Sequence, residues 1–194
     1  MEAQFGFEAG SPAAQSRDLG LDGLFFKSAD GRRIAQFRRD GLTLNQLPPY
    51  TNADDLIVEA LRLWQAFRQV AAPTAITRVA FRYINVLPLP YRPGDSFQRF
   101  LKAPPQMPDG APQNVTSFLT RVVSRDGQDS VVVTLSLEPA FGERVPVTLD
   151  LDVFRVGSFL PDGSELRPVL QRLRQLKNAV FFASLTEEAV ELFV

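Results

Sequence analysis

The chain has no cysteine and no histidine among its 194 residues. Without cysteine there is no disulfide and no thiolate nucleophile, and without histidine there is no Ser-His-Asp triad and no imidazole ligand for zinc. The side chains that remain for catalysis are carboxylates, lysine, tyrosine, serine and threonine, with oxygen atoms as ligands for a metal ion. We therefore favour a non-enzymatic role and assign no cofactor and no metal site.

Lysine is also scarce, and neither sign of charge predominates. Three of the 21 basic residues are lysines, Lys27, Lys102 and Lys177, and 22 acidic residues bring the formal net charge to −1 at pH 7. A chain with this balance has no global field that would draw it onto nucleic acid or an acidic membrane surface. A charged partner would have to bind at a local patch.

Long hydrophobic runs are absent as well. No stretch approaches the roughly 18 uninterrupted apolar residues of a membrane span. The first 20 residues lack the basic segment and apolar segment that mark a secretion signal. We expect a soluble, cytoplasmic protein with no membrane partner. Residues 1–23 are rich in glycine and polar side chains, which predicts a flexible N-terminal lead or an arm that pairs with a sheet edge.

The sequence does contain short β-like runs separated by turns. Asp30-Gly31 and Asp40-Gly41 divide three such runs, and Asp-Gly suits the positive φ angles of hairpin turns. Residues 24–47 therefore predict a three-strand meander. From 53 to 71 apolar residues recur at helical spacing, which predicts an amphipathic helix. We take residues 24–72 as the first half of the fold.

The second half, residues 76–194, repeats this order of elements. It has a strand at 76–86, a second three-strand meander that starts near residue 115, and an amphipathic helix at 165–182. We predict an α+β fold in which residues 24–194 form a single domain. Its twisted antiparallel sheet is built from the two meanders and the strand, and the helices pack on one face.

The shared order of elements favours a pseudo-duplicated saddle. The second half has a strand and a short helix in front of its meander, whereas residues 1–23 are too short to supply both to the first half. We therefore expect an N-terminal strand and helix to be missing and apolar surface to be left uncovered. Exposed apolar patches usually bind a partner. This predicts a homo-oligomer or a complex with a protein partner.

The runs ITRVAFRYIN and QLKNAVFFASLTEEAVELF carry a family resemblance. The chain resembles a family of sporadically distributed, uncharacterised bacterial proteins with an Arg-Tyr-Ile-Asn strand motif and a closing helix whose Phe precedes a threonine-started turn. The residues that match are Arg78, Arg82, Tyr83, Ile84, Asn85, Lys177, Phe181, Phe182 and Thr186. The resemblance implies a bacterial cytoplasmic setting and a longer N-terminal region. It implies no activity, cofactor or catalytic residue.

Four charged side chains on two strands form the first candidate site. Arg78 and Arg82 share one face of their strand, and Asp150 and Asp152 share one face of the run TLDLDVF. If the two faces coincide, the pattern favours cross-strand ion pairs. The alternatives are an anion pocket, or an acidic metal site with Glu138 as a third ligand.

Two further groups of polar side chains are candidates. Tyr83 and Asn85 share a strand face with Val79 and Phe81, which favours core packing over a role in ligand binding. The densest basic spot of the chain comprises Arg32, Arg33, Arg38 and Arg39. Because the net charge is near zero, a solvated hairpin rim is favoured there over nucleic-acid contact.

Three functions follow from these observations. The leading hypothesis is a non-enzymatic binding or interaction module that associates with itself or with a protein partner. The second is a small-ligand, anion-binding or carboxylate-dependent hydrolytic protein that uses the two arginines and two aspartates of the first candidate site. The third is nucleic-acid binding through the hairpin that spans residues 32–39.

Overall fold

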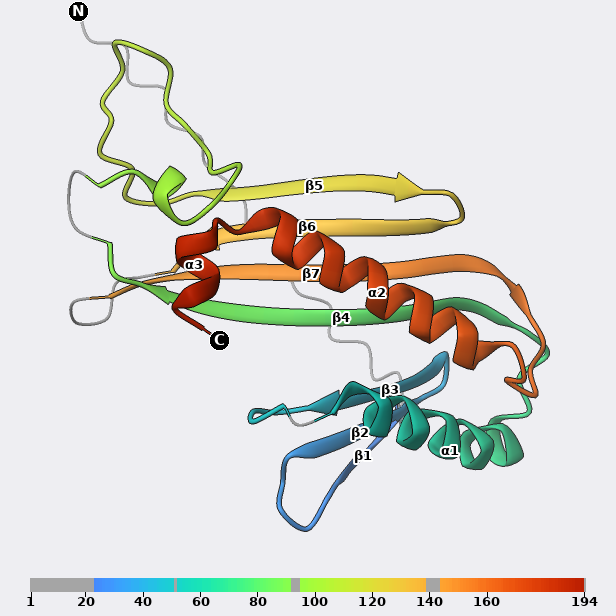
Figure 1. The fold of residues 1–194 in the computed structure, drawn as a ribbon. Coiled ribbons are helices and arrows are strands. Elements are labelled where there is room, and N and C mark those ends of the chain that lie inside the picture. Colours follow the sequence, from blue (N-terminus) through green and yellow to red (C-terminus); the bar gives the residue numbers. More distant parts are fainter. Residues whose placement is uncertain (1–22, 51, 92–94, 139–143, 194) are drawn as a thin grey trace, which may run out of the picture. The chain divides into compact units, whose positions relative to one another are not determined.

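A computed structural model describes residues 23–50, 52–91, 95–138 and 144–193 (Figure 1). The predicted N-terminal lead therefore lies, except for residue 23, outside the described residues. The elements are β1 (Gly23–Lys27), β2 (Arg33–Arg38), β3 (Gly41–Gln46), α1 (Ala53–Ala71), β4 (Ile76–Leu89), a short 3-10 helix (Phe97–Arg99), β5 (Leu119–Asp126), β6 (Asp129–Leu137), β7 (Val145–Phe159), α2 (Leu166–Ser184) and α3 (Glu187–Glu191). All the described strand pairs are antiparallel. The predicted α+β class is confirmed.

The expectation of one sheet shared by the two halves is corrected. The described strands form a three-stranded sheet in the order β1-β2-β3 and a four-stranded sheet in the order β4-β7-β6-β5. The strand β7 is 15 residues long and pairs with β4 as well as with β6. As a result β4 belongs to the sheet of the second meander and not to that of the first. No strand ladder among the described residues joins the meanders, so they do not form one continuous saddle-shaped sheet. Three strands followed by a long helix do occur in both halves, as β1-β2-β3-α1 and β5-β6-β7-α2.

The chain separates into two compact units, Met1–Pro49 and Tyr50–Val194. The boundary follows Pro49, and α1 therefore belongs to the second unit, whereas the sequence pattern placed this helix in the first half. In the first unit, β2 lies between β1 and β3. Strand pairing gives this small sheet one apolar face, made by Leu24, Phe26, Ala35, Phe37, Leu42 and Leu44.

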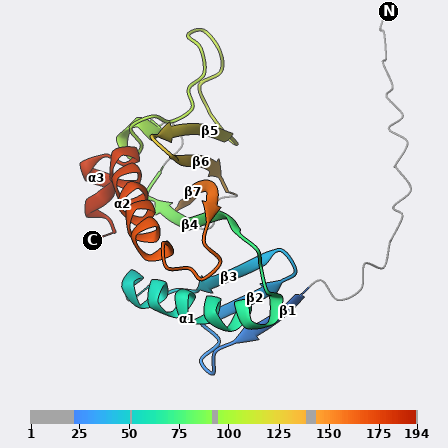
Figure 2. The same cartoon turned by 90° about the vertical axis from the view of Figure 1, so that its right-hand side faces the viewer.

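In the second unit one face of the four-stranded sheet is covered by helices. Alternation along β7 points Leu149, Leu151 and Val153 to the same face, and all three are fully buried. The helix α2 packs against β7 and β4 on this face. Figure 2 shows the strands nearly end-on, with α2 and α3 together on one side of the sheet.

Side-chain caps mark the starts of α1 and α3 in the second unit. The side chain of Asn52 accepts a hydrogen bond from the backbone N–H of Asp54 and so caps α1. Thr186 caps α3 in the same way through the N–H of Ala189. Trp64 of α1 donates its indole N–H to the carbonyl of Pro161, in the loop before α2, at 3.0 Å. Among the described residues, no helix has the length and apolar character needed to cross a membrane.

Candidate functional site

The four charged residues of the first candidate site meet on the sheet face opposite α2. Arg82 of β4 donates from Nε and Nη2 to the carboxylate oxygens of Asp150 at 2.9 and 2.6 Å. Arg78 donates from Nη2 to both oxygens of Asp152, at 3.1 and 2.8 Å. The guanidinium of Arg78 also lies 4.5 Å from the ring centre of Phe154. On β7, Phe154 lies between Asp152 and the residue that pairs with Arg78. The result is a row of two cross-strand ion pairs.

These four side chains satisfy one another rather than converge on a ligand. Each arginine is turned along the sheet to a carboxylate on β7, and the hydrogen bonds that Arg82 donates to Asp150 raise the pKa of Arg82. Glu138 lies four residues beyond Thr134, the partner of Asp150 on β6. That separation is about 13 Å along an extended strand. Among the described residues, no group of three acidic side chains is placed to hold a metal ion.

Tyr83 and Asn85 lie on the other face of the sheet, under α2. The amide of Asn85 donates to the carbonyl of Leu149 at 3.0 Å. The ring of Tyr83 stacks on Phe81, and burial raises the pKa of its phenol. The ammonium of Lys177 in α2 lies 3.8 Å from the centre of the Tyr83 ring. Both side chains are half-buried and have partners within the second unit.

The four hairpin arginines do not form one cluster. Arg32 and Arg33 follow the turn before β2, and Arg38 and Arg39 come at its other end, about 16 Å away along the strand. The side chain of Arg33 donates to Gln46 at 2.9 Å, and Arg38 lies 3.6 Å from Asp40. This separation leaves two small basic sites in place of the dense patch that the sequence suggested.

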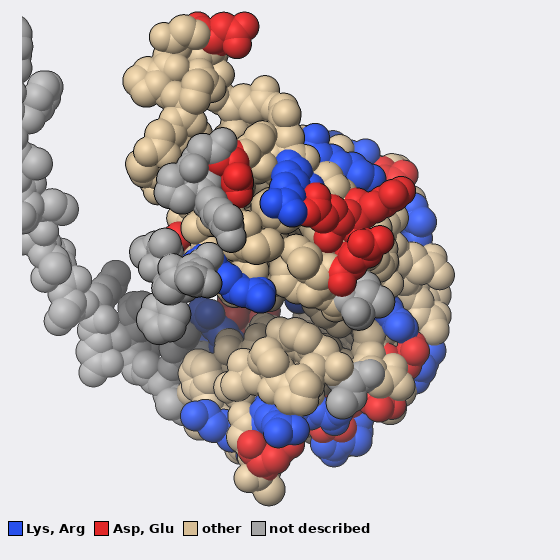
Figure 3. Space-filling model, turned by 60° about the vertical axis from the view of Figure 1, so that its left-hand side comes forward, with Lys and Arg blue, Asp and Glu red and all other residues tan. Residues whose placement is uncertain are grey.

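Charge is mixed elsewhere too. On the part of the face in Figure 3 that belongs to the described residues, acidic and basic side chains lie in small neighbouring groups. Such a surface gives little long-range attraction for a polyanion.

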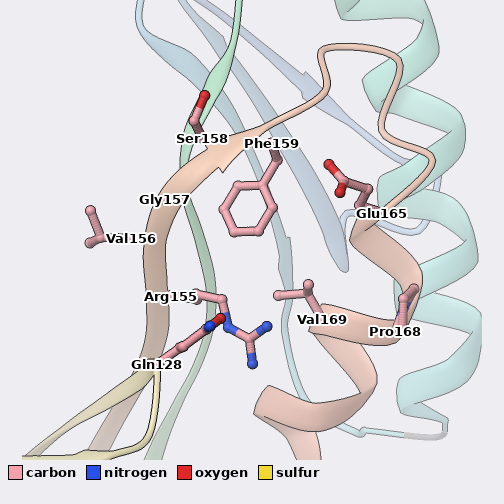
Figure 4. Close-up of a pocket in the computed structure, with 9 residues that line it drawn as sticks. All are labelled: Gln128, Arg155, Val156, Gly157, Ser158, Phe159, Glu165, Pro168 and Val169. Atoms are coloured by element: carbon pink, nitrogen blue, oxygen red, sulfur yellow. The ribbon is translucent and has the colours of Figure 1, made fainter.

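A pocket of about 530 Å³ lies beside the end of β7 and the start of α2. Figure 4 shows the ring of Phe159 between the guanidinium of Arg155 and the carboxylate of Glu165. Arg155 donates to the buried Asp129 at 2.7 and 3.0 Å, and Glu165 accepts from the N–H of Leu160 at 2.9 Å. The volume is in the range of ligand sites, but both charged groups are already held by the chain itself.

Exposed apolar side chains of the second unit lie along β5. This strand forms one edge of the four-stranded sheet. Leu119, Val122 and Val123 are 73%, 60% and 53% exposed. Val122 points to the helix side of the sheet and Val123 to the other side, so β5 is uncovered on both faces. We call this strand, with its outer backbone edge, the β5 edge.

Sequence reasoning missed three of these features, and two of them left a signal. Lys177 follows Leu173 by four residues and precedes Val180 by three, which places it on the apolar stripe of its helix. The consecutive Val122 and Val123 put apolar side chains on both faces of one strand. The pairing of Arg155 with Asp129 has no sequence signal, because it depends on the strand register.

A scan against protein-family models, a search of curated proteins and a search of solved structures each found no match to this chain. The family resemblance carried by the Arg-Tyr-Ile-Asn run therefore stays a prediction.

Proposed function

We propose that the protein is a non-enzymatic interaction module that associates with itself through the β5 edge. The observation that supports this most directly is the exposure of β5 on both faces and along its outer edge. An unpaired strand edge offers a row of N–H and C=O groups that another strand can pair with. Apolar side chains on both faces add burial to that pairing.

The other functions have weaker support. A ligand-binding or hydrolytic site at Arg78, Arg82, Asp150 and Asp152 would need free groups, whereas each guanidinium there is bound to a carboxylate. Nucleic-acid binding by the hairpin would need a continuous basic surface, and its arginines lie at opposite ends of β2. These observations favour association between proteins over the other two functions.

The test is the molar mass in solution, measured by light scattering over a concentration series. The unaltered chain is expected to pass from the mass of one copy to that of two as concentration rises. Val122→Lys introduces a charge at the middle of the β5 edge and is expected to keep the chain monomeric.

Val156→Lys is the matched control for this test. Val156 is as exposed as Val122, at 66% against 60%, but lies on β7, which β6 separates from β5. Its variant is expected to associate like the unaltered chain. A single-copy mass for the unaltered chain at every concentration would contradict the proposed function.

A further inference from the structure

The backbone of β5 alternates between its partner strand and the open edge. The turn between β5 and β6 consists of Gly127 and Gln128, and Gly127 has a φ of 61°. In a hairpin with a two-residue turn the closing pair, here Asp126 and Asp129, is hydrogen-bonded, and bonded pairs then recur at every second residue. The odd-numbered residues Leu119, Arg121, Val123 and Arg125 therefore direct their N–H and C=O groups to the open edge.

An edge of this kind fits a second copy of itself. Two identical strands related by a two-fold axis perpendicular to the sheet pair antiparallel, and both copies use the same residues. Each face of one sheet continues into the same face of the other only when odd-numbered residues oppose odd-numbered ones and even-numbered residues oppose even-numbered ones. Two of the registers that this allows pair seven of the eight residues of β5, and they place Val122 or Val123 opposite its own copy.

The charges of β5 distinguish these registers. With Val123 at the axis, Arg121 faces Arg125 of the second copy. With Val122 at the axis, Arg121 faces Val123 and Leu119 faces Arg125, so that no like charges are directly opposite. Arginine on an edge strand opposes strand pairing in general, and here it selects one register.

We propose that two copies of the chain join their four-stranded sheets through antiparallel pairing of β5 with β5, with Val122 facing Val122 of the second copy. This inference rests on the proposed function and adds the geometry of the interface. The four odd-numbered residues of each strand then make about eight interchain backbone hydrogen bonds. The exposed Val122 side chains meet at the axis on the helix side of the continuous sheet.

Because the chain has no cysteine, single-cysteine variants report the register cleanly. Val122 directs its backbone toward β6, so facing Val122 residues form a non-hydrogen-bonded pair, whose Cα atoms are about 4.5 Å apart, within the range that a disulfide spans. Under mild oxidation Val122→Cys is expected to form the covalent dimer at least tenfold faster than Val123→Cys. Val156→Cys, on β7, sets the background rate.

A second pair of variants tests the same register without changing Val122. Thr120 faces Ser124 of the second copy on the helix side, again in a non-hydrogen-bonded pair. A mixture of Thr120→Cys and Ser124→Cys is expected to cross-link between the two variants, and neither variant is expected to cross-link alone above background.

The outcomes separate the register from the function. If light scattering shows a dimer but Val123→Cys cross-links as fast as Val122→Cys, or the mixed pair does not cross-link, the register is overturned and the proposed function stands. If every variant under reducing conditions, and the unaltered chain, has the mass of one copy, both are overturned.

Discussion

At the scale of single residues, Lys177 is the most unusual group in the described structure. It is 9% exposed, on the buried stripe of α2, with its ammonium against the ring of Tyr83. Burial, and to a lesser extent the charge of the neighbouring Arg174, lowers its pKa to about 8. Arg174 itself is paired with Asp54 of α1 at 2.7 Å. The folded protein therefore holds a cation that the unfolded chain solvates better.

This burial makes stability depend on pH. The ordinary pKa of lysine is 10.5 and the folded value is about 8. Below pH 8 both states are protonated and the folded state bears the full penalty; between 8 and 10.5 the folded state releases its proton first. The free energy of unfolding is therefore expected to rise from pH 7 to 9.5, by at most about 1.4 kcal/mol per pH unit.

Lys177→Met is expected to be more stable than the unaltered chain at pH 7 and to lose this rise. Urea unfolding at several pH values measures both effects, and Lys102→Met, at an exposed lysine, is the control. An equal rise with pH in Lys177→Met would show that another group is responsible.

At the scale of elements, local patterns in the sequence predicted individual strands and helices, but no pattern predicted which distant strands pair. The Asp-Gly pairs predicted the meander of β1, β2 and β3, and helical spacing predicted α1 with the bounds that the structure shows. Which strands pair is a different matter. Pairing between β4 and β7 joins residues about 70 positions apart, such as Arg82 and Asp152, and alternation within either strand says nothing about the partner.

The same limit applies to the candidate site. Because side chains alternate along a strand, the sequence predicted that Arg78 and Arg82 share one strand face and that Asp150 and Asp152 share another. It could not tell that the two faces coincide. The hairpin arginines show the opposite error, since residues close in sequence on an extended strand end far apart in space.

The turn between β7 and α2 offers a test at this scale. Gly163 has a φ of 73°, and a Cβ there would lie 2.8 Å from Cδ1 of Trp64 in α1. Gly163→Ala is therefore expected to lower the free energy of unfolding by about 2 kcal/mol, from backbone strain and a steric clash together. Urea unfolding followed by the fluorescence of the single tryptophan measures it.

Gly110→Ala is the matched control for the turn. Gly110 also has a positive φ, 83°, but a Cβ there would meet no atom within 4 Å. Its variant is expected to lose about 1 kcal/mol from backbone strain alone. Equal losses in the two variants would show that the contact with Trp64 does not matter.

At the scale of the whole molecule, the four-stranded sheet of the second unit has two edge strands, β4 and β5, which differ in how far they are covered. The helix α2 covers β4 and β7, while β5 keeps an uncovered edge with apolar side chains on both faces. Composition could suggest a binding module, because the sequence has no cysteine or histidine for catalysis. It could not locate the interface that we propose at β5, which depends on the strand order β4-β7-β6-β5.

The central claim is that the outer edge of β5 pairs with a second copy, and amide hydrogen exchange at single-residue resolution tests it most directly. At low protein concentration the outward amides of Leu119, Arg121, Val123 and Arg125 are expected to exchange fast, while the amides between them, bonded to β6, are protected. Raising the concentration is expected to slow the outward amides alone. Fast exchange of these four amides at every concentration would contradict the account.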